Sequence, residues 1–261
     1  MTLADRGKLF AEINAIADLA GAEIMQFYRG EIHAQRKADN SPVTAADIAA
    51  ERIILAGLQR LTPNIPVVAE EEASKGKVIK VGNEPFWLVD PLDGTKEFIA
   101  HRDQFTVNIA LIENFSPTMG IVLAPALRTS YATDGLGTVV KRIGKNAPKP
   151  ISARQIPEKN VIVTASRSHG NRNKIQELIR DYVISNVVIS GSSIKFCMVA
   201  SGEADLYPRY GPTYEWDIAA GHAVLKAAGG SVKTLDGREI RYGKSDFLNP
   251  EFIAYGKKGD A

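Results

Sequence analysis

The segment Trp87-Leu-Val-Asp90-Pro-Leu-Asp93-Gly94-Thr95 carries two carboxylates three positions apart after an apolar run. Pro91 restricts the backbone at this turn and removes a donor, and Gly94 lets the chain approach a ligand closely. Two carboxylates that converge at a strand end suit Mg²⁺, which takes oxygen ligands and keeps positions for water and substrate phosphate. A solvated Asp-Gly turn is the ordinary alternative, but the order strand, Asp, Pro, x, Asp, Gly, Thr favours a metal site.

Two more acids lie at the ends of predicted elements. The run Glu70–Glu72 follows the apolar segment 65–69, so Glu70 could share the mouth of a sheet with Asp90, although such runs are usually solvated. Asp217 falls in the first turn of a predicted helix, where the helix dipole favours an acid even without a metal. Four carboxylates of this kind suit two or more metal ions, which activate water and neutralise phosphoryl oxygens. The pattern predicts metal-dependent phosphate hydrolysis.

Asp47 and Thr95 have structural and catalytic interpretations. Asp47 follows Thr44 by three residues, as in a capping box at a helix start, and Thr95 could simply cap another helix. In contact, the two side chains could orient a metal-activated water. The sequence alone does not bring them together.

Hydrophobic periodicity predicts an α/β protein with antiparallel pairing in the first half and alternating strands and helices in the second. Helices are expected over residues 4–29, from Thr44 onward, and over 172–182, 194–200 and 215–228; strands are expected over 67–69, 86–89, 105–112, 119–124, 161–164, 187–190 and 204–207, with a hairpin around Asp134-Gly135. The proline-rich segment 145–157 is the expected boundary between two subdomains. We therefore expect a layered α-β-α-β-α sandwich with mixed and antiparallel sheets.

Composition narrows the functional class. The 261 residues include 32 basic and 30 acidic side chains, a net charge of +2, and no dense basic run, which argues against a nucleic-acid polymer as partner. Cys197 is the only cysteine, so neither an intramolecular disulfide nor a cysteine metal site is expected. No signal peptide or run of roughly 18 apolar residues is visible. We expect a cytoplasmic protein without an integral membrane segment; peripheral association with the inner membrane and the choice between monomer and homodimer stay open.

In two segments the chain resembles the inositol monophosphatase superfamily of Mg²⁺-dependent, lithium-sensitive phosphatases. The two segments that carry the resemblance are Asp90-Pro-Leu-Asp-Gly-Thr-Lys-Glu-Phe98 and Trp216-Asp-Ile-Ala-Ala-Gly221. Within the superfamily the chain is most similar to 3′(2′),5′-bisphosphate nucleotidases of the bacterial CysQ type, on the segments 166–170, 191–197 and 206–212. The resemblance extends from about residue 4 to residue 254.

The resemblance implies roles for individual residues. The implied metal ligands are Glu70, Asp90, Asp93, Asp217 and the Leu92 carbonyl; Asp47, Glu70 and Thr95 are the implied catalytic residues; Asp93, Gly94 and Thr95 would meet the scissile phosphate, and His169, Ser192, Lys195 and Arg209 the nucleotide and its second phosphate. Whether Glu70 or Glu71 is the principal ligand is open. His169 could instead cap a helix, Lys195 could be a surface lysine and Arg209 could pair with a structural carboxylate. Phe196 and Cys197 are expected in the core.

The resemblance implies two or three Mg²⁺ ions, with Mn²⁺ as a substitute, and a small phosphate monoester as substrate. The expected reaction removes the 3′-phosphate of adenosine 3′,5′-bisphosphate by metal-activated water, giving AMP and phosphate, with 3′-phosphoadenosine 5′-phosphosulfate as a second substrate. The subdomains would cover 1–150, with most metal ligands, and 151–261, with Asp217 and the nucleotide-binding residues. An inositol or sugar monophosphatase is the alternative, and a non-catalytic phosphate-binding protein is a remote one. A haloacid-dehalogenase phosphatase is disfavoured because its two aspartates lie two positions apart.

Overall fold

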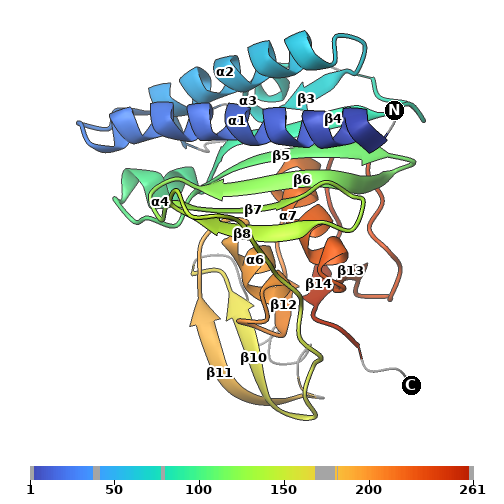
Figure 1. The fold of residues 1–261 in the computed structure, drawn as a ribbon. Helices are drawn as coiled ribbons and strands as arrows, with labels where there is room; N and C mark the ends of the chain where they lie inside the picture. The colour runs from blue at the N-terminus through green and yellow to red at the C-terminus, as the bar shows by residue number, and fades with distance from the viewer. Residues whose placement is uncertain (1–2, 38–41, 78–79, 168–179, 181, 259–261) are drawn as a thin grey trace.

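The structure is a computed structural model that describes residues 3–37, 42–77, 80–167, 180 and 182–258. Its elements form alternating layers of helices and sheets (Figure 1). The helices are α1 (Leu3–Tyr28), α2 (Ala45–Leu61), α3 (Glu70–Ser74), α4 (Thr95–Ile99), α6 (Ile194–Ala200) and α7 (Glu215–Ala227). In the described part of the chain no helix is long and apolar enough to cross a membrane.

The strands form three sheets. The largest has seven strands in the order β3-β4-β5-β6-β7-β8-β9 and is antiparallel apart from the parallel β3–β4 pair. These strands are β3 (Val67–Ala69), β4 (Phe86–Asp93), β5 (Thr106–Glu113), β6 (Ser116–Ala124), β7 (Thr129–Thr133), β8 (Val139–Ile143) and β9 (Lys149–Pro150). A two-stranded hairpin pairs β1 (Ala34–Arg36) with β2 (Pro42–Thr44).

The third sheet has five strands in the mixed order β11-β10-β12-β14-β13. Its members are β10 (Lys159–Ala165), β11 (Val183–Ile189), β12 (Leu206–Arg209), β13 (Ser231–Thr234) and β14 (Phe252–Tyr255). In Figure 1, α1 and α2 cover one face of the seven-stranded sheet, and α6 and α7 lie between the two large sheets. The expected mixed and antiparallel layered α/β fold is confirmed. The helix expected over 172–182 lies almost wholly outside the described residues.

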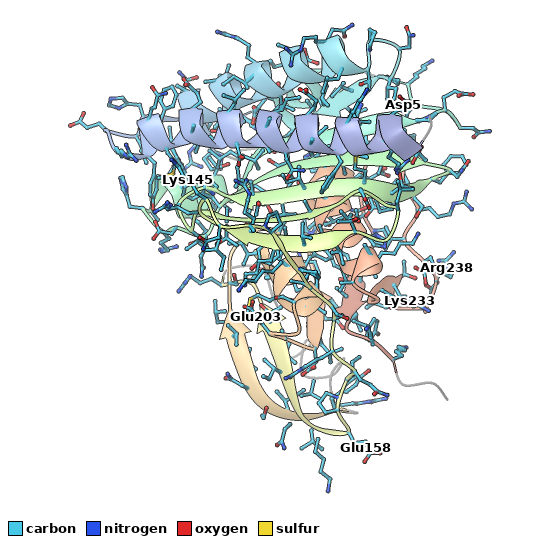
Figure 2. All side chains as sticks on the ribbon, viewed as in Figure 1. Asp5, Lys145, Glu158, Glu203, Lys233 and Arg238 are labelled. Carbon is cyan, nitrogen blue, oxygen red and sulfur yellow. The ribbon has the colours of Figure 1, made fainter. Side chains whose placement is uncertain are left out.

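Two apolar cores fill the space between these layers. One packs α1 and α2 against the seven-stranded sheet, and the other fills the space around α6 and α7 and includes Phe196 and Cys197, as predicted. Charged side chains such as Lys145, Glu158 and Arg238 lie at the periphery (Figure 2). The burial of one face of each helix and sheet accounts for the layered arrangement.

The strand expected to end at Val89 continues to Asp93, so Asp90 and Asp93 lie within β4 rather than after it. Asp90 pairs with Asn108 and Asp93 with Thr106, with an irregular register between the two pairs. Pro91 falls at this irregularity because it cannot donate a hydrogen bond to the ladder. The bulge therefore brings both carboxylates to one end of the sheet without ending the strand.

Candidate active site

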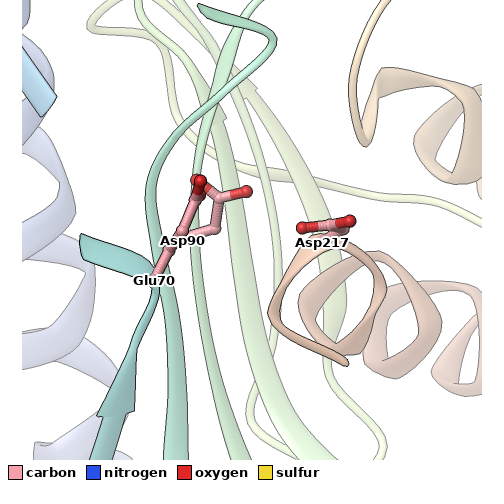
Figure 3. Close-up of side chains that lie close together, drawn as sticks. All are labelled: Glu70, Asp90 and Asp217. Carbon is pink, nitrogen blue, oxygen red and sulfur yellow. The ribbon is translucent and has the colours of Figure 1, made fainter. Parts of the chain in front are cut away.

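Three carboxylates from distant parts of the chain meet at one point. Glu70 begins α3 directly after β3, Asp90 lies in β4, and Asp217 lies in the first turn of α7. Each offers one oxygen, and these oxygens lie within 4.8 Å of one another (Figure 3). We predicted from the sequence that Glu70, Asp90 and Asp217 share a site, and the fold brings them together.

Local hydrogen bonds orient two of these acids. Asp217 is the third residue of α7, and its Oδ2 accepts a 2.8 Å hydrogen bond from the backbone N–H of Tyr214, the residue before the helix. Asp90 Oδ1 accepts a 3.0 Å hydrogen bond from the backbone N–H of Leu92. The helix start and the bulge in β4 thus fix the side chains before any ligand binds.

The cluster carries more negative charge than its neighbours compensate, because Asp90 and Asp217 repel each other and Glu70. Burial and then the neighbouring Glu70, Asp93 and Asp217 raise the pKa of Asp90 well above its ordinary value. For Asp217, burial and the nearby Asp93 and Glu70 likewise raise the pKa. Buried carboxylates with this mutual repulsion need either protons or a cation. Their oxygens are the donors that Mg²⁺ prefers, so the residues present fit a divalent ion.

Asp93 lies beside the cluster, facing cations. Burial raises its pKa, while the positive charge of Lys195 and hydrogen bonds from Ser193 oppose that rise. Gly94 follows with φ +93°, and a Cβ there would lie 3.2 Å from the Gln104 carbonyl oxygen. A residue with a side chain would be strained at this turn. Gly94 therefore lets the chain turn from β4 into α4, which starts at Thr95.

Thr95 contacts both Asp47 and Leu92. Thr95 Oγ1 lies 3.2 Å from Asp47 Oδ1 and 3.2 Å from the Leu92 carbonyl oxygen. Asp47 also closes the predicted capping box of α2, because its Oδ2 accepts from the N–H and the hydroxyl of Thr44 at 2.7 and 2.6 Å. Burial raises the pKa of Asp47 to about 6 although the Thr44 hydrogen bonds work against this.

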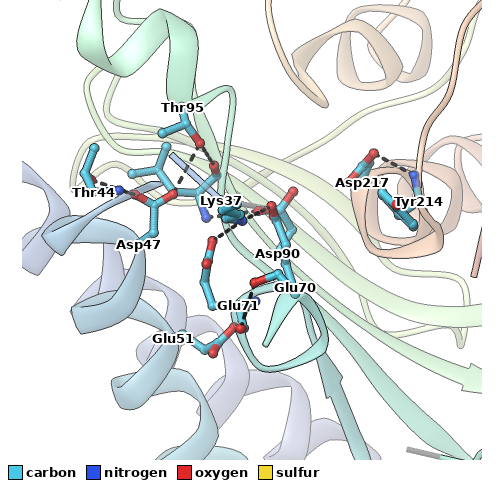
Figure 4. A network of polar contacts seen from close by, with 12 residues as sticks. Lys37, Thr44, Asp47, Glu51, Glu70, Glu71, Asp90, Thr95, Tyr214 and Asp217 are labelled. Atoms are coloured by element: carbon cyan, nitrogen blue, oxygen red, sulfur yellow. Dashed lines mark hydrogen bonds and ion pairs between the residues drawn. The ribbon is translucent and has the colours of Figure 1, made fainter. Parts of the chain in front are cut away.

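A lysine that sequence reasoning missed binds the glutamate run. Lys37 Nζ lies 2.7 Å from Glu70 Oε1 and 2.6 Å from Glu71 Oε1 (Figure 4). Burial tends to lower the pKa of Lys37, but the two glutamates outweigh it and the pKa is raised. Glu70 belongs to the carboxylate cluster, whereas Glu71 is not part of it. This geometry favours Glu70 over Glu71 as the ligand.

A cavity of about 210 Å³ opens beside the carboxylates. Its lining includes the carboxylates Glu70, Asp93 and Asp217, the predicted phosphate and nucleotide contacts Gly94, Thr95, Ser192, Lys195 and Arg209, and Ser166, Arg167 and Tyr207, which sequence reasoning had not assigned a role. The predicted contact His169 lies outside the described residues. Ser192 has φ +47°, and its buried hydroxyl has no hydrogen-bond partner among the described residues. Such unusual geometry is often found at ligand sites.

Lys195, one of the cations that line the cavity, is held in place. Lys195 is 3% exposed, and burial lowers its pKa to about 8. Its Nζ donates to the Ser192 carbonyl oxygen at 2.5 Å and lies 5.1 Å from the centre of the Tyr207 ring. The alternative of a surface lysine is therefore wrong.

Arg209 was expected in a loop after a strand over 204–207, but it is the last residue of β12, whose pairing with β14 extends to Phe252. Its Nη1 donates to Ser166 Oγ at 2.9 Å and its Nη2 to the Pro212 carbonyl oxygen at 3.2 Å. Its buried Nε has no hydrogen-bond partner among the described residues. No carboxylate is bonded to Arg209 in that part of the chain, which leaves it suited to an anion.

Comparisons with known proteins identify the family of this chain. The family model described as "Inositol monophosphatase family" matches residues 7–258. A 3′(2′),5′-bisphosphate nucleotidase CysQ of Escherichia coli O6:H1 is 44% identical over 244 residues, covering 92% of this chain and 97% of that protein. The corresponding protein of Salmonella typhimurium is 44% identical over 247 residues, with coverages of 94% and 98%.

Solved structures give the same answer. The crystal structure of CysQ from Bacteroides thetaiotaomicron matches with a TM-score of 0.77 at 36% identity, covering 95% of this chain and 99% of that one. An inositol monophosphatase from Thermotoga maritima shares the fold, with a TM-score of 0.76 at 23% identity over 92% of this chain and 89% of its own. With the family match extending over nearly the whole length and these carboxylates in place, the chain belongs to the inositol monophosphatase family.

Proposed function

We propose that this protein is a metal-dependent 3′(2′),5′-bisphosphate nucleotidase. It removes the 3′-phosphate of adenosine 3′,5′-bisphosphate, giving AMP and inorganic phosphate, and 3′-phosphoadenosine 5′-phosphosulfate is a second candidate substrate. The observation that carries the proposal is one cavity lined both by carboxylates and by Lys195 and Arg209. A substrate with two phosphates can place one at metal held by the carboxylates and the other at the two cations. The curated relatives named as bisphosphate nucleotidases support this choice.

Mg²⁺ is the proposed cofactor, with two or three ions per site and Mn²⁺ as a substitute. Glu70, Asp90, Asp93, Asp217 and the Leu92 carbonyl would hold the ions. When bound, the metal supplies positive charge to phosphoryl oxygens and lowers the pKa of water. Full turnover in excess EDTA would contradict a metal-dependent reaction.

Thr95 and Asp47 would handle the proton of the attacking water. Thr95 Oγ1 can donate to Asp47 Oδ1, which leaves the hydroxyl oxygen free to accept a hydrogen bond from water. Burial holds the pKa of Asp47 at about 6, so this carboxylate is largely ionised at neutral pH and able to take a proton. Glu70 is the third proposed catalytic residue, since it lies in the carboxylate cluster and lines the cavity.

Gly94 and Thr95, with Asp93, would meet the phosphate that is cleaved. Lys195 and Arg209, with Ser192 and His169, would bind the nucleotide and the phosphate that stays. Each charge-assisted hydrogen bond to a phosphate contributes roughly 1.5–3 kcal/mol. This division of labour predicts a preference for substrates with two phosphates.

The alternative within the family is an inositol or sugar monophosphatase with the same carboxylate set. Phosphate release from adenosine 3′,5′-bisphosphate, inositol 1-phosphate and fructose 1,6-bisphosphate at equal Mg²⁺ separates the two. A preference for inositol 1-phosphate would replace the nucleotidase proposal, and no release from any substrate would favour a phosphate-binding protein. The division into residues 1–150 and 151–261, and a cytoplasmic location with or without peripheral membrane association, also remain proposals.

A further inference from the structure

Lys37 and the carboxylate cluster share one side chain, Glu70. The ammonium group of Lys37 lies 2.7 Å from Glu70 Oε1, and its side chain is only 8% exposed. Glu70 also offers an oxygen to the cluster with Asp90 and Asp217. The buried ammonium group of Lys37 therefore contacts Glu70, a residue that the proposed function assigns to the metal (Figure 4).

Glu71 gives this lysine a second, fixed partner. Glu71 Oε1 lies 2.6 Å from Lys37 Nζ, and the Glu71 side chain is 2% exposed. The backbone N–H of Glu71 donates to Glu51 Oε2 at 2.8 Å, which ties the start of α3 to α2. Glu71 is outside the cluster, so it can keep the ammonium group nearby when Glu70 turns to another cation.

The ammonium of Lys37 and a divalent ion compete for the same negative charge. Two positive charges on one carboxylate repel each other, and little water is available at a buried site to screen them. Lys37 follows β1, whose three residues pair with β2, and β2 leads directly into α2 and Asp47. A change in the position of Lys37 would therefore also shift the hairpin formed by β1 and β2, next to the site.

We propose that Lys37 is an internal competitor of the metal: it occupies Glu70 in the metal-free protein and is displaced from it when a divalent ion binds. This inference rests on the proposed metal-dependent function. Lys37 then lowers the affinity of the site for metal. In the absence of metal it forms an ion pair with Glu70 and another with Glu71. Two linked equilibria of this kind typically couple by about 5–150-fold in affinity.

The test is direct Mn²⁺ binding, followed by the electron paramagnetic resonance signal of the free ion. The double variant Lys37→Met with Glu71→Gln removes one positive and one negative charge, so the net charge near Glu70 is unchanged while its contact with the ammonium group is lost. We expect Mn²⁺ to bind at least about fivefold more tightly. Equal or weaker binding would overturn the competition.

A matched control lies at and just after the short helix α3. Lys77 Nζ and Glu72 Oε2 form a 2.6 Å ion pair that is partly exposed and does not involve Glu70. The variant Lys77→Met with Glu72→Gln should bind Mn²⁺ as the wild type does. An equal gain in this control would overturn the specific role of Lys37. If the wild-type protein binds no Mn²⁺ at all, the proposed metal-dependent function itself fails, which is a distinguishable result.

A second measurement needs no variant and covers the case in which the double variant does not fold. Acetylation of lysine side chains in the wild-type protein, quantified by mass spectrometry with and without Mg²⁺, reports the accessibility of each amine. We expect Lys37 to react slowly without metal, because its side chain is buried, and several-fold faster with Mg²⁺. Exposed Lys77 provides the internal reference. An unchanged or slower reaction of Lys37 with Mg²⁺ would overturn the displacement.

Discussion

Thr95 Oγ1 lies 3.2 Å from Asp47 Oδ1, so the first residue of α4 contacts an acid in the first turn of α2. The two oxygens of Asp47 have different partners, because Oδ2 accepts from Thr44 and Oδ1 faces Thr95. The helix cap thereby holds the carboxylate in the orientation that the proposed proton transfer needs. A structural and a catalytic role coincide in one side chain.

Thr95→Val should abolish most activity and leave the fold intact. Valine keeps the shape of the half-buried side chain but cannot exchange a proton with Asp47. Loss of such a positioned group lowers kcat by about 10²–10⁴-fold. Steady-state kinetics and a thermal melt measure the two effects, and Thr95→Ser is the control that should retain much of the rate. A valine variant with near-normal kcat would mean that Thr95 has only a structural role at the start of α4.

Arg209→Ala should weaken use of adenosine 3′,5′-bisphosphate. The loss of a charge-assisted contact predicts a fall in kcat/KM of about one to two decades, corresponding to roughly 1.5–3 kcal/mol. Inositol 1-phosphate, with no second phosphate, should be hydrolysed nearly as before. Exposed Arg167 lines the same cavity, and Arg167→Ala is the matched control for loss of one positive charge. If both substrates suffer equally in the Arg209 variant, Arg209 has a structural role instead.

Asp90→Asn should stabilise the metal-free protein. Burial and three neighbouring carboxylates raise the pKa of Asp90, so its ionised form opposes folding at neutral pH. Removing the charge is expected to raise the free energy of unfolding in EDTA by about 1–3 kcal/mol. The same variant should gain less stability than the wild type from added Mg²⁺, since a ligand stabilises only through its binding to the folded state.

Thermal unfolding in EDTA and in Mg²⁺ measures both effects of this substitution. Glu158→Gln removes a charge from an exposed position and should change neither value. A less stable Asp90→Asn protein in EDTA would show that the carboxylate is held by favourable contacts rather than crowded by its neighbours.

His222 should make stability fall in mild acid. It is buried in α7 against Tyr242, with 2.9 Å between its Nδ1 and the phenol oxygen, and burial, aided by Lys226, lowers its pKa to about 3. The unfolded chain binds a proton near pH 6.5, so the stability contributed by neutral His222 is complete above that pH and is lost as pH falls toward 3. The expected loss at pH 5 is about 2 kcal/mol.

Urea unfolding of the wild type and of His222→Gln between pH 7.5 and pH 5 measures this contribution. The free energy of unfolding of the wild type, relative to that of the variant, should fall by about 2 kcal/mol over this range, because only the wild type carries the imidazole that must stay neutral in the folded state. Parallel curves for the two proteins would contradict the assignment.

Local patterns determined much of this protein. The capping box of α2, the amphipathic helix α1 and the apolar part of β4 up to Val89 follow from spacing and residue type within short segments. The signatures around Asp90 and Asp217 were enough to indicate the family, because the chemistry of metal-bound phosphate restricts which residues can follow one another there.

Tertiary structure alone decided the rest. The meeting of Glu70, Asp90 and Asp217 depends on the order of strands in a sheet and on the packing of α7, which no local period encodes. The extension of β12 to Arg209 depends on pairing with β14, and the pairing of Lys37 with Glu70 and Glu71 depends on where a short hairpin lies. Contacts between residues far apart in the chain are set by the packing of whole layers. The sequence therefore indicated which side chains could react, whereas the contacts that each of them makes could be read only from the fold.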